Sequence, residues 1–195
     1  MRETLDDIVR WLGEGKRVAQ ATVVSLIGSA PRGAGATLVA SDAGDIAGSV
    51  SNGCVEPDVV EQAQRVMRSG KPRLLTYGVS EEQNYERIGL SCGGEIRVFI
   101  ERIERTPEIG ALEAAHHAGR PAVRAQVIAT PGEGGPALGE TLTVIEGSEA
   151  SGQLLGSPLG EAISSRAREL IGAASPVVER IPLTGAPEPG GEVEV

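Results

Sequence analysis

The feature that most constrains the fold is an internal repeat in the sequence. When the chain is shifted by 104 residues without a gap, glycines, prolines and apolar residues of the two halves coincide. The matches pair Gly15 with Gly119, Ala21 with Ala125, Val23 with Val127, Gly28 with Gly132, Gly35 with Gly139, Thr37-Leu38 with Thr141-Leu142, Gly48 with Gly152, Ala63 with Ala167 and Pro72 with Pro176. Matching glycines and prolines indicate matching turns. Chance supplies several matches in a chain with 27 glycines, but the shared order of elements favours duplication.

Hydrophobic periodicity fills in the elements between these turns. Apolar residues at helical spacing predict helices over residues 4–12, 58–68 and 107–117, and β-branched or alternating runs predict strands over 18–27, 37–40, 46–50, 73–77 and 95–100. The sequence therefore predicts an α/β fold with two related halves, each a small mixed sheet flanked by helices, with a pseudo-twofold internal repeat. We expect the first copy in residues 1–104 and a degenerate copy in 105–184. The Pro, Gly and Glu-rich residues 185–195 are expected to be disordered.

Charge and composition exclude several classes of protein. The net charge is −9, and residues 101–195 hold 7 basic against 14 acidic side chains, which argues against nucleic-acid binding. No stretch approaches the roughly 20 apolar residues of a membrane span, and Met1 leads into a charged amphipathic segment. We therefore expect a cytoplasmic protein without a membrane partner. Cys54 and Cys92 are the two cysteines, and reduced thiols are the expectation.

Residues 48–57, with the sequence Gly-Ser-Val-Ser-Asn-Gly-Cys-Val-Glu-Pro, concentrate chemical groups between a predicted strand and a predicted helix. Pro57 suits the first turn of a helix, and the glycines permit a tight backbone path. Unpaired amides and the helix dipole favour an anion at such a turn, and would make Cys54 a better nucleophile or metal ligand. The alternative is that Cys54 is a small buried apolar side chain.

The second copy indicates which residues carry chemistry. Where residues 51–56 read Ser-Asn-Gly-Cys-Val-Glu, residues 155–160 read Leu-Gly-Ser-Pro-Leu-Gly. The thiol, the amide and the carboxylate are missing there, so Asn52, Cys54 and Glu56 are the favoured functional residues. We also expect the second copy to lack a counterpart of residues 91–94, Ser-Cys-Gly-Gly.

Each remaining candidate has a plainer interpretation. Ser49, Ser51 and Asn52 suit helix capping, and Glu56 suits either a general base or a cap. Cys92, before Gly93 and Gly94, belongs to a second site or to a close backbone crossing. The loop of residues 28–35 resembles a phosphate cradle but lacks the Gly-Lys-Ser/Thr ending. Arg32 in that loop suits a phosphate, a carboxylate or solvent.

Five motifs in order resemble the XdhC/CoxI family, accessory proteins of molybdenum hydroxylases such as xanthine dehydrogenase. They are Ala-Thr-Val-Val at 21–24, Gly-Ser-Ala-Pro at 28–31, residues 48–56, Pro-Arg-Leu-Leu-Thr-Tyr-Gly at 72–78 and Gly-Leu-Ser-Cys-Gly-Gly at 89–94. The resemblance is dense over residues 5–104. Asn52 departs from it, since a glycine is expected there. The chain resembles the N-terminal region of the family, without the C-terminal Rossmann domain of longer members.

The resemblance implies a chaperone that binds the molybdenum–pyranopterin cofactor, as molybdopterin or a dinucleotide form, and delivers it to an apo-hydroxylase. The implied cofactor-binding residues are Cys54, Cys92, Gly48, Ser49, Ser51, Asn52, Gly53, Glu56, Gly93, Gly94 and Arg32, with Cys54 as the molybdenum contact and no residue assigned to catalysis. Two alternatives stay open. One is a sulfur-transfer enzyme that uses Cys54 with a cysteine desulfurase, and the other is a non-catalytic interaction protein with structural cysteines. A homodimer is also left open.

Overall fold

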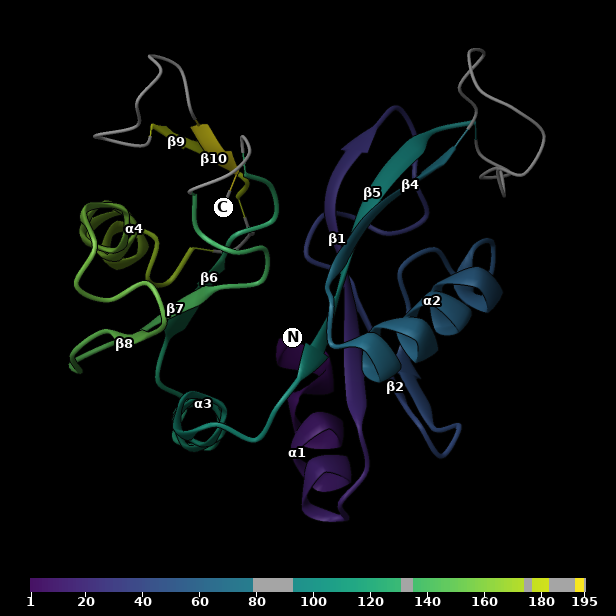
Figure 1. Cartoon of the computed structure of the whole chain (residues 1–195), viewed down its shortest axis with the longest axis horizontal. Helices are drawn as coiled ribbons and strands as arrows, with labels where there is room; N and C mark the ends of the chain where they lie inside the picture. Colours follow the sequence, from purple (N-terminus) through teal and green to yellow (C-terminus); the bar gives the residue numbers. More distant parts are fainter. Residues whose placement is uncertain (79–92, 131–134, 174–176, 183–191, 195) are drawn as a thin grey trace. The chain divides into compact units, whose positions relative to one another are not determined.

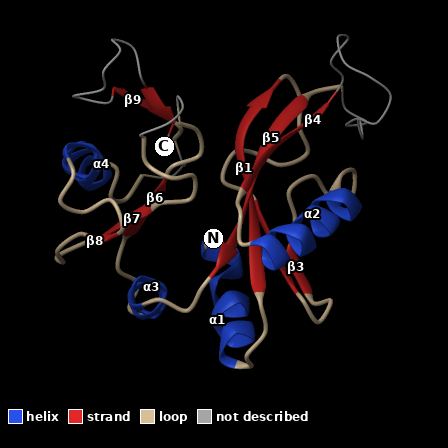
Figure 2. Cartoon of the chain, viewed as in Figure 1, coloured by secondary structure: helices blue, strands red, loops and turns tan. Residues whose placement is uncertain are grey.

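The computed structural model describes residues 1–78, 93–130, 135–173, 177–182 and 192–194. The chain divides into two compact units. Unit 1 comprises Met1–Arg105 with Ser175–Val177, and unit 2 comprises Thr106–Ala174 with Val178–Val195. The copy boundary expected from the sequence lay at residue 104. Each unit combines helices with antiparallel strands (Figure 2).

Unit 1 is a five-stranded antiparallel sheet with helices on both faces (Figure 1). Its elements are η1 (Arg2–Thr4), α1 (Leu5–Gly13), β1 (Val18–Ile27), β2 (Thr37–Ser41), β3 (Ile46–Gly48), α2 (Glu56–Ser69), β4 (Arg73–Gly78) and β5 (Glu95–Ile103). The strand order is β3-β2-β1-β5-β4. β1 and β5 are the longest strands; the loop of residues 28–35 follows β1, and Gly93 and Gly94 precede β5.

Strand alternation divides the core of unit 1 between the two faces of the sheet. Alternate residues of β1, β2 and β5 pack with the apolar stripe of α2, which includes Val59, Ala63 and Val66. On β2, Thr37 alternates with Leu38 and points to the opposite face, where its hydroxyl lies 3.2 Å from that of Thr4. The short helix η1, which leads directly into α1, therefore lies on the second face of the sheet.

Unit 2 contains a smaller version of the same elements. They are α3 (Pro107–His117), β6 (Ala122–Gln126), β7 (Thr141–Ile145), β8 (Ser151–Gly152), α4 (Pro158–Glu169), β9 (Arg180–Pro182) and β10 (Glu192–Glu194). The strands form a three-stranded sheet, β6-β7-β8, and a β9-β10 pair. The core between α4 and the sheet is built from Val127, Leu142, Val144, Leu154, Leu159, Ile163 and Ala167.

The repeat predicted from the sequence is confirmed by residue-level equivalences at the same offset of 104. Each residue in the core between α4 and the sheet of unit 2 is the counterpart of a core residue of unit 1: Val23, Leu38, Ala40, Val50, Val55, Val59 and Ala63. The strand registers agree as well, because Thr22 pairs with Thr37 as Gln126 pairs with Thr141. The turns agree in backbone conformation, with φ of 83° at Gly35 and 88° at Gly139. Two structurally related halves are therefore a property of the fold.

The end of the described chain corrects the expectation of a disordered tail. Glu192–Glu194 form β10, which pairs with β9 and bridges to Ala129. Glu194 lies opposite Arg180 and Ala129, as Arg97 in unit 1 lies opposite Thr76 and Ser25. The strand β10 is therefore the counterpart of β5.

This equivalence also changes the comparison of the two copies. In the sequence it aligns Gly-Gly-Glu-Val-Glu-Val at 190–195 with Gly-Gly-Glu-Ile-Arg-Val at 93–98. Residues 91, 92 and 183–191 lie outside the described residues, so the expected absence of a counterpart to residues 91–94 stays a prediction. Local composition favoured disorder for the end of the chain, whereas Glu192–Glu194 form a strand because they pair with β9 and Ala129. Residues 183–191 and 195 lie outside the described residues.

The α/β fold of two related halves is confirmed, but the sheets differ from the expectation in one respect. Every strand pair among the described residues is antiparallel, so the sheets are not mixed. Short connections join β2 to β3 and β7 to β8, as antiparallel neighbours permit. None of the described helices combines the length and apolarity that crossing a bilayer demands.

Candidate functional site

The turn between β3 and α2, residues 49–56, is organised around the carboxylate of Glu56; we call it the cysteine turn. The Oε1 atom of Glu56 accepts from the Ser49 hydroxyl at 2.6 Å and from the amides of Val50 at 3.2 Å and Ser51 at 2.8 Å. The Oε2 atom accepts from the Gly53 amide at 2.7 Å and from the Ser51 hydroxyl. The amides of this turn were expected to be available to an anion, but the protein's own carboxylate already accepts hydrogen bonds from three of them.

The environment of Glu56 fixes its charge. Burial raises the pKa of this carboxyl, but the hydrogen bonds from Ser49 and Ser51 outweigh it and lower the pKa to about 2. The carboxylate is therefore ionised at neutral pH and is a weak base, which disfavours the general-base role. Nor does Glu56 occupy the N-cap position of α2. That position belongs to Val55, and Glu56 is the first helical residue, stabilising the turn that precedes the helix.

Asn52 lies at the exposed tip of the cysteine turn in the left-handed region, with φ of 55°. Asparagine is among the few residues other than glycine that tolerate this conformation. The equivalent residue in unit 2 is Gly156, with φ of 77°. Asn52 therefore adopts the positive φ that the expected glycine would adopt, and adds an amide side chain.

Cys54 combines features of both interpretations weighed from the sequence. Its side chain is half-buried and packs against the core beneath α2, as a structural cysteine would. Its backbone lies between Gly53, whose amide binds Glu56, and Val55, whose amide donates to the Ser51 hydroxyl at 2.9 Å. The position directly before α2 agrees with the sequence, and the role of the thiol stays a prediction.

The glycine loop, residues 28–35, adjoins the cysteine turn. The Asn52 side-chain amide donates to the Pro31 carbonyl at a long distance of 3.5 Å. Arg32 forms an ion pair with Glu3 at 3.0 Å, and the Glu3 side chain is 70% exposed. Exposed pairs of this kind contribute about 0–1 kcal/mol, so Arg32 can exchange Glu3 for another anion at little cost.

The start of β5 closes against the glycine loop. A Cβ atom on Gly94 would lie 2.0 Å from the Ser29 carbonyl oxygen, and one on Gly78 would lie 2.7 Å from the Gly94 carbonyl oxygen. Gly94 thus makes the close backbone crossing that the sequence analysis weighed, whereas Gly93 is exposed. Cys92 lies outside the described residues. The structure therefore brings together the cysteine turn, the glycine loop and the start of β5.

Two contributions to this region were missed from the sequence. Gly78 was assigned no role, although a glycine at the end of a strand is a signal for a close backbone approach. The Tyr77 hydroxyl donates to Asp58 at 2.6 Å and so joins the end of β4 to the first turns of α2. No local pattern predicts that second contact, because it depends on how the helix crosses the sheet.

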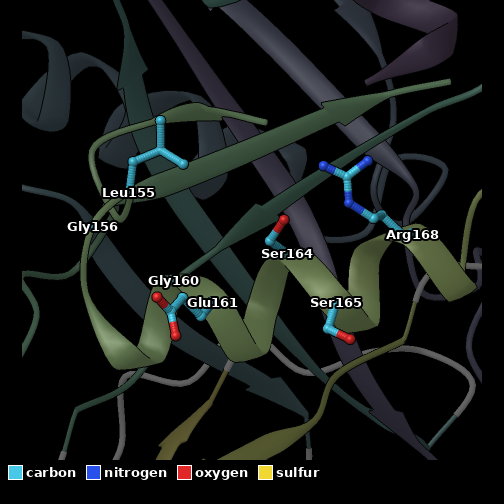
Figure 3. A pocket seen from close by; sticks show the side chains of 7 residues that line it. All are labelled: Leu155, Gly156, Gly160, Glu161, Ser164, Ser165 and Arg168. Atoms are coloured by element: carbon cyan, nitrogen blue, oxygen red, sulfur yellow. The ribbon is translucent and has the colours of Figure 1, made fainter. Parts of the chain in front are cut away.

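A shallow hollow of about 370 Å³ lies in unit 2, along the turn that includes Leu155 and Gly156 and along α4. Figure 3 shows Leu155 and Gly156 on the turn before α4, and Ser164, Ser165 and Arg168 along that helix. This is the unit 2 counterpart of the cysteine turn, without its thiol or carboxylate. Across the described parts of both units, no cluster of three or more His, Cys, Asp or Glu side chains is arranged to hold a metal ion. We therefore centre the candidate site on the cysteine turn.

Comparisons with known proteins find a family profile, several relatives and a solved structure that resemble this chain. Residues 11–78 match the profile of the XdhC and CoxI family. The chain is 35% identical over 111 residues to the molybdenum cofactor insertion chaperone PaoD of Escherichia coli, covering 57% of this chain and 34% of PaoD. It is 34% identical over 98 residues to the uncharacterized protein YqeB of E. coli, covering 50% of this chain and 18% of YqeB. It is 33% identical over 93 residues to a probable xanthine dehydrogenase subunit of Bacillus subtilis, covering 47% and 28% of the two chains.

A solved structure shares the fold. The chain superimposes on a xanthine dehydrogenase crystal structure from Bacillus halodurans with a TM-score of 0.61 and 24% identity, covering 77% of this chain and 45% of the other. Of the curated relatives named above, the chain spans about a third of the length or less. The profile match over residues 11–78 includes β1 to β4, the glycine loop and the whole cysteine turn. Through these residues of unit 1, the chain is similar to the XdhC and CoxI family.

Proposed function

We propose that this chain binds the molybdenum–pyranopterin cofactor as cargo and assists its maturation or its insertion into a xanthine dehydrogenase-type hydroxylase. The observation that carries the proposal is the family match, which contains the entire cysteine turn. PaoD, whose name describes a molybdenum cofactor insertion chaperone, supports the choice of cargo. The B. subtilis relative, whose name describes a probable component of xanthine dehydrogenase, supports a hydroxylase as the partner.

The donor groups of unit 1 fit one part of such a cargo better than another. Cys54 is a soft sulfur ligand, which suits molybdenum or its sulfur ligands. The amides of Val50, Ser51 and Gly53 do not fit a phosphate, because Glu56 already fills that position with negative charge. A phosphate would instead meet the exposed side of the turn at Asn52.

The anionic end of the cargo needs a cation, and Arg32 on the neighbouring glycine loop supplies one. Its present partner, Glu3, is largely exposed and easily replaced. Arg32 carries a guanidinium group, which can pair with phosphate through two parallel hydrogen bonds. We therefore assign the thiol contact to Cys54 and the phosphate contact to Arg32. Cys92 stays the predicted second thiol contact.

The test is to co-express the chain with the cofactor pathway and to measure bound molybdopterin and molybdenum after purification without oxygen. Wild type is expected to carry cofactor, and Cys54→Ser is expected to lose most of it, because the serine hydroxyl is a hard ligand. Ser165→Ala on α4 is the matched control, since this exposed hydroxyl belongs to unit 2. Equal cofactor content in wild type and Cys54→Ser would show that the thiol does not hold the cargo.

A further inference from the structure

One of the positions at which the two copies of the turn differ holds a carboxylate in unit 1 and a glycine in unit 2. Position 56 holds Glu56 in unit 1, and the equivalent position 160 holds Gly160 in unit 2. Both turns share the left-handed residue, Asn52 or Gly156. They differ in what fills the space beside the first residues of the helix.

In unit 2 the backbone itself fills that space. A Cβ atom on Gly160 would lie 1.8 Å from the Leu154 carbonyl oxygen. Ser157 bridges the two elements, donating to this carbonyl at 2.8 Å and accepting from the Gly160 amide at 3.0 Å. The turn is therefore closed onto α4, and no side chain fits at position 160.

In unit 1 the equivalent position carries a side chain, and the Glu56 carboxylate accepts hydrogen bonds from the turn that precedes the helix. Amides of Val50, Ser51 and Gly53 converge on the carboxylate, where unit 2 directs the Leu154 carbonyl toward the helix. The two hydroxyl donors, Ser49 and Ser51, complete its contacts.

The same contacts fix the backbone on both sides of Cys54. Gly53, before it, donates directly to Glu56 at 2.7 Å. Val55, after it, donates to the Ser51 hydroxyl, which is itself bonded to Glu56. The tip residues Asn52 and Gly53 are exposed in this arrangement. An anionic ligand does not gain from replacing Glu56, because the replacement would release the hydrogen bonds that hold the thiol in place.

We infer that Glu56 is a positioning residue, whose carboxylate holds the cysteine turn open and fixes the backbone around Cys54 without contacting the ligand. This inference rests on the proposed function and specifies how the thiol is presented. It also distinguishes the two copies. The Glu56 carboxylate holds the turn of unit 1 open, whereas the Leu154 carbonyl occupies the turn of unit 2.

The test compares Glu56→Gln, Glu56→Asp and wild type. Gln keeps the size of the side chain but places an NH₂ group against N–H donors, whereas Asp keeps the charge. Glu61→Gln is the matched control, because Glu61 is an exposed carboxylate on the same helix that pairs with Arg65. The first measurement is the rate at which iodoacetamide modifies Cys54 in cofactor-free protein, followed by mass spectrometry well below the melting temperature. The second is the cofactor content after co-expression.

For Glu56→Gln we expect the rate of Cys54 modification to change by about five-fold or more and the cofactor content to fall by a similar factor. The reason is that an N–H donor of the turn is left without an acceptor, which makes the turn less ordered. Glu56→Asp should lie between Gln and wild type, and Glu61→Gln should match wild type. A Cys54 rate in Glu56→Gln equal to wild type would overturn the inference.

The two proposals fail in different ways. If Cys54→Ser loses the cofactor while Glu56→Gln retains it, the positioning role is refuted and the proposed function stands. If wild type carries no cofactor, the proposed function fails, and the modification rates alone decide the role of Glu56.

Discussion

Replacing Glu56 by Gln should destabilise unit 1 in a manner that depends on pH. The carboxyl has its pKa lowered from an ordinary value of 4.5 to about 2 by the hydroxyl and amide donors of the cysteine turn. Each tenfold change in proton affinity is worth about 1.4 kcal/mol, so the ionised form gains at most about 3 kcal/mol on folding. Because Glu56 is only half-buried, solvent screening reduces this to about 1.5–2 kcal/mol.

The sign follows from the direction of the shift. A carboxyl whose folded pKa is depressed contributes its full stability above the unfolded pKa, near 4.5, and loses it as the pH falls toward 2. Glu56→Gln has no titrating group at this position and resembles the protonated carboxyl in shape. The difference in unfolding free energy between wild type and Glu56→Gln should therefore be largest above pH 5 and should vanish near pH 2.

Trp11 provides the assay. It is the only tryptophan in the sequence, lies in α1 of unit 1 and is 4% exposed, so its fluorescence reports unfolding of this unit. Urea titrations of cofactor-free wild type and Glu56→Gln at several pH values between 2 and 7 give the difference. Glu61→Gln should differ from wild type by no more than about 0.5 kcal/mol, since it loses one exposed helical ion pair. A difference for Glu56→Gln that stays constant from pH 7 to pH 2 would refute the assignment of the carboxylate as the charged centre of the turn.

Two further predictions use the same fluorescence assay. Asn52→Gly should keep stability within about 0.5 kcal/mol, whereas Asn52→Val should cost about 1–2 kcal/mol, because a β-branched residue is strained at φ of 55°; equal stability of the two variants would contradict the left-handed conformation. Gly94→Ala should cost at least about 3 kcal/mol, because its Cβ atom would lie 2.0 Å from the Ser29 carbonyl oxygen. Gly33→Ala, where the added atom meets open space, is its control; a Gly94→Ala protein as stable as this control would show that β5 does not cross the glycine loop so closely.

Much of the fold was accessible from the sequence because glycine positions report backbone conformation. Gly15 and Gly119, or Gly35 and Gly139, recur at one offset since each adopts a positive φ that other residues rarely take. The periodicity of apolar residues then placed the helices, and α2 and α3 begin and end within two residues of the expected limits. Both signals are local, which is why they survive without knowledge of the tertiary structure.

The errors arose where a residue depends on a distant partner. Composition predicted disorder for the end of the chain, but pairing with Arg180 and Ala129 makes a strand of Glu192–Glu194. The strand directions also could not be obtained, because a β-propensity pattern does not distinguish parallel from antiparallel neighbours. Pairing partners are chosen by the whole sheet rather than by the segment.

The candidate site shows the same division. Its residue types determined that a thiol, an amide and a carboxylate meet in one turn before a helix, and that the second copy lacks them. Only the tertiary structure decided that the carboxylate of Glu56 accepts hydrogen bonds from the amides of Val50, Ser51 and Gly53. The glycines permitted either the open turn of unit 1 or the closed turn of unit 2. The two turns differ in the direction of their backbone amides and carbonyls. The sequence does not specify that direction.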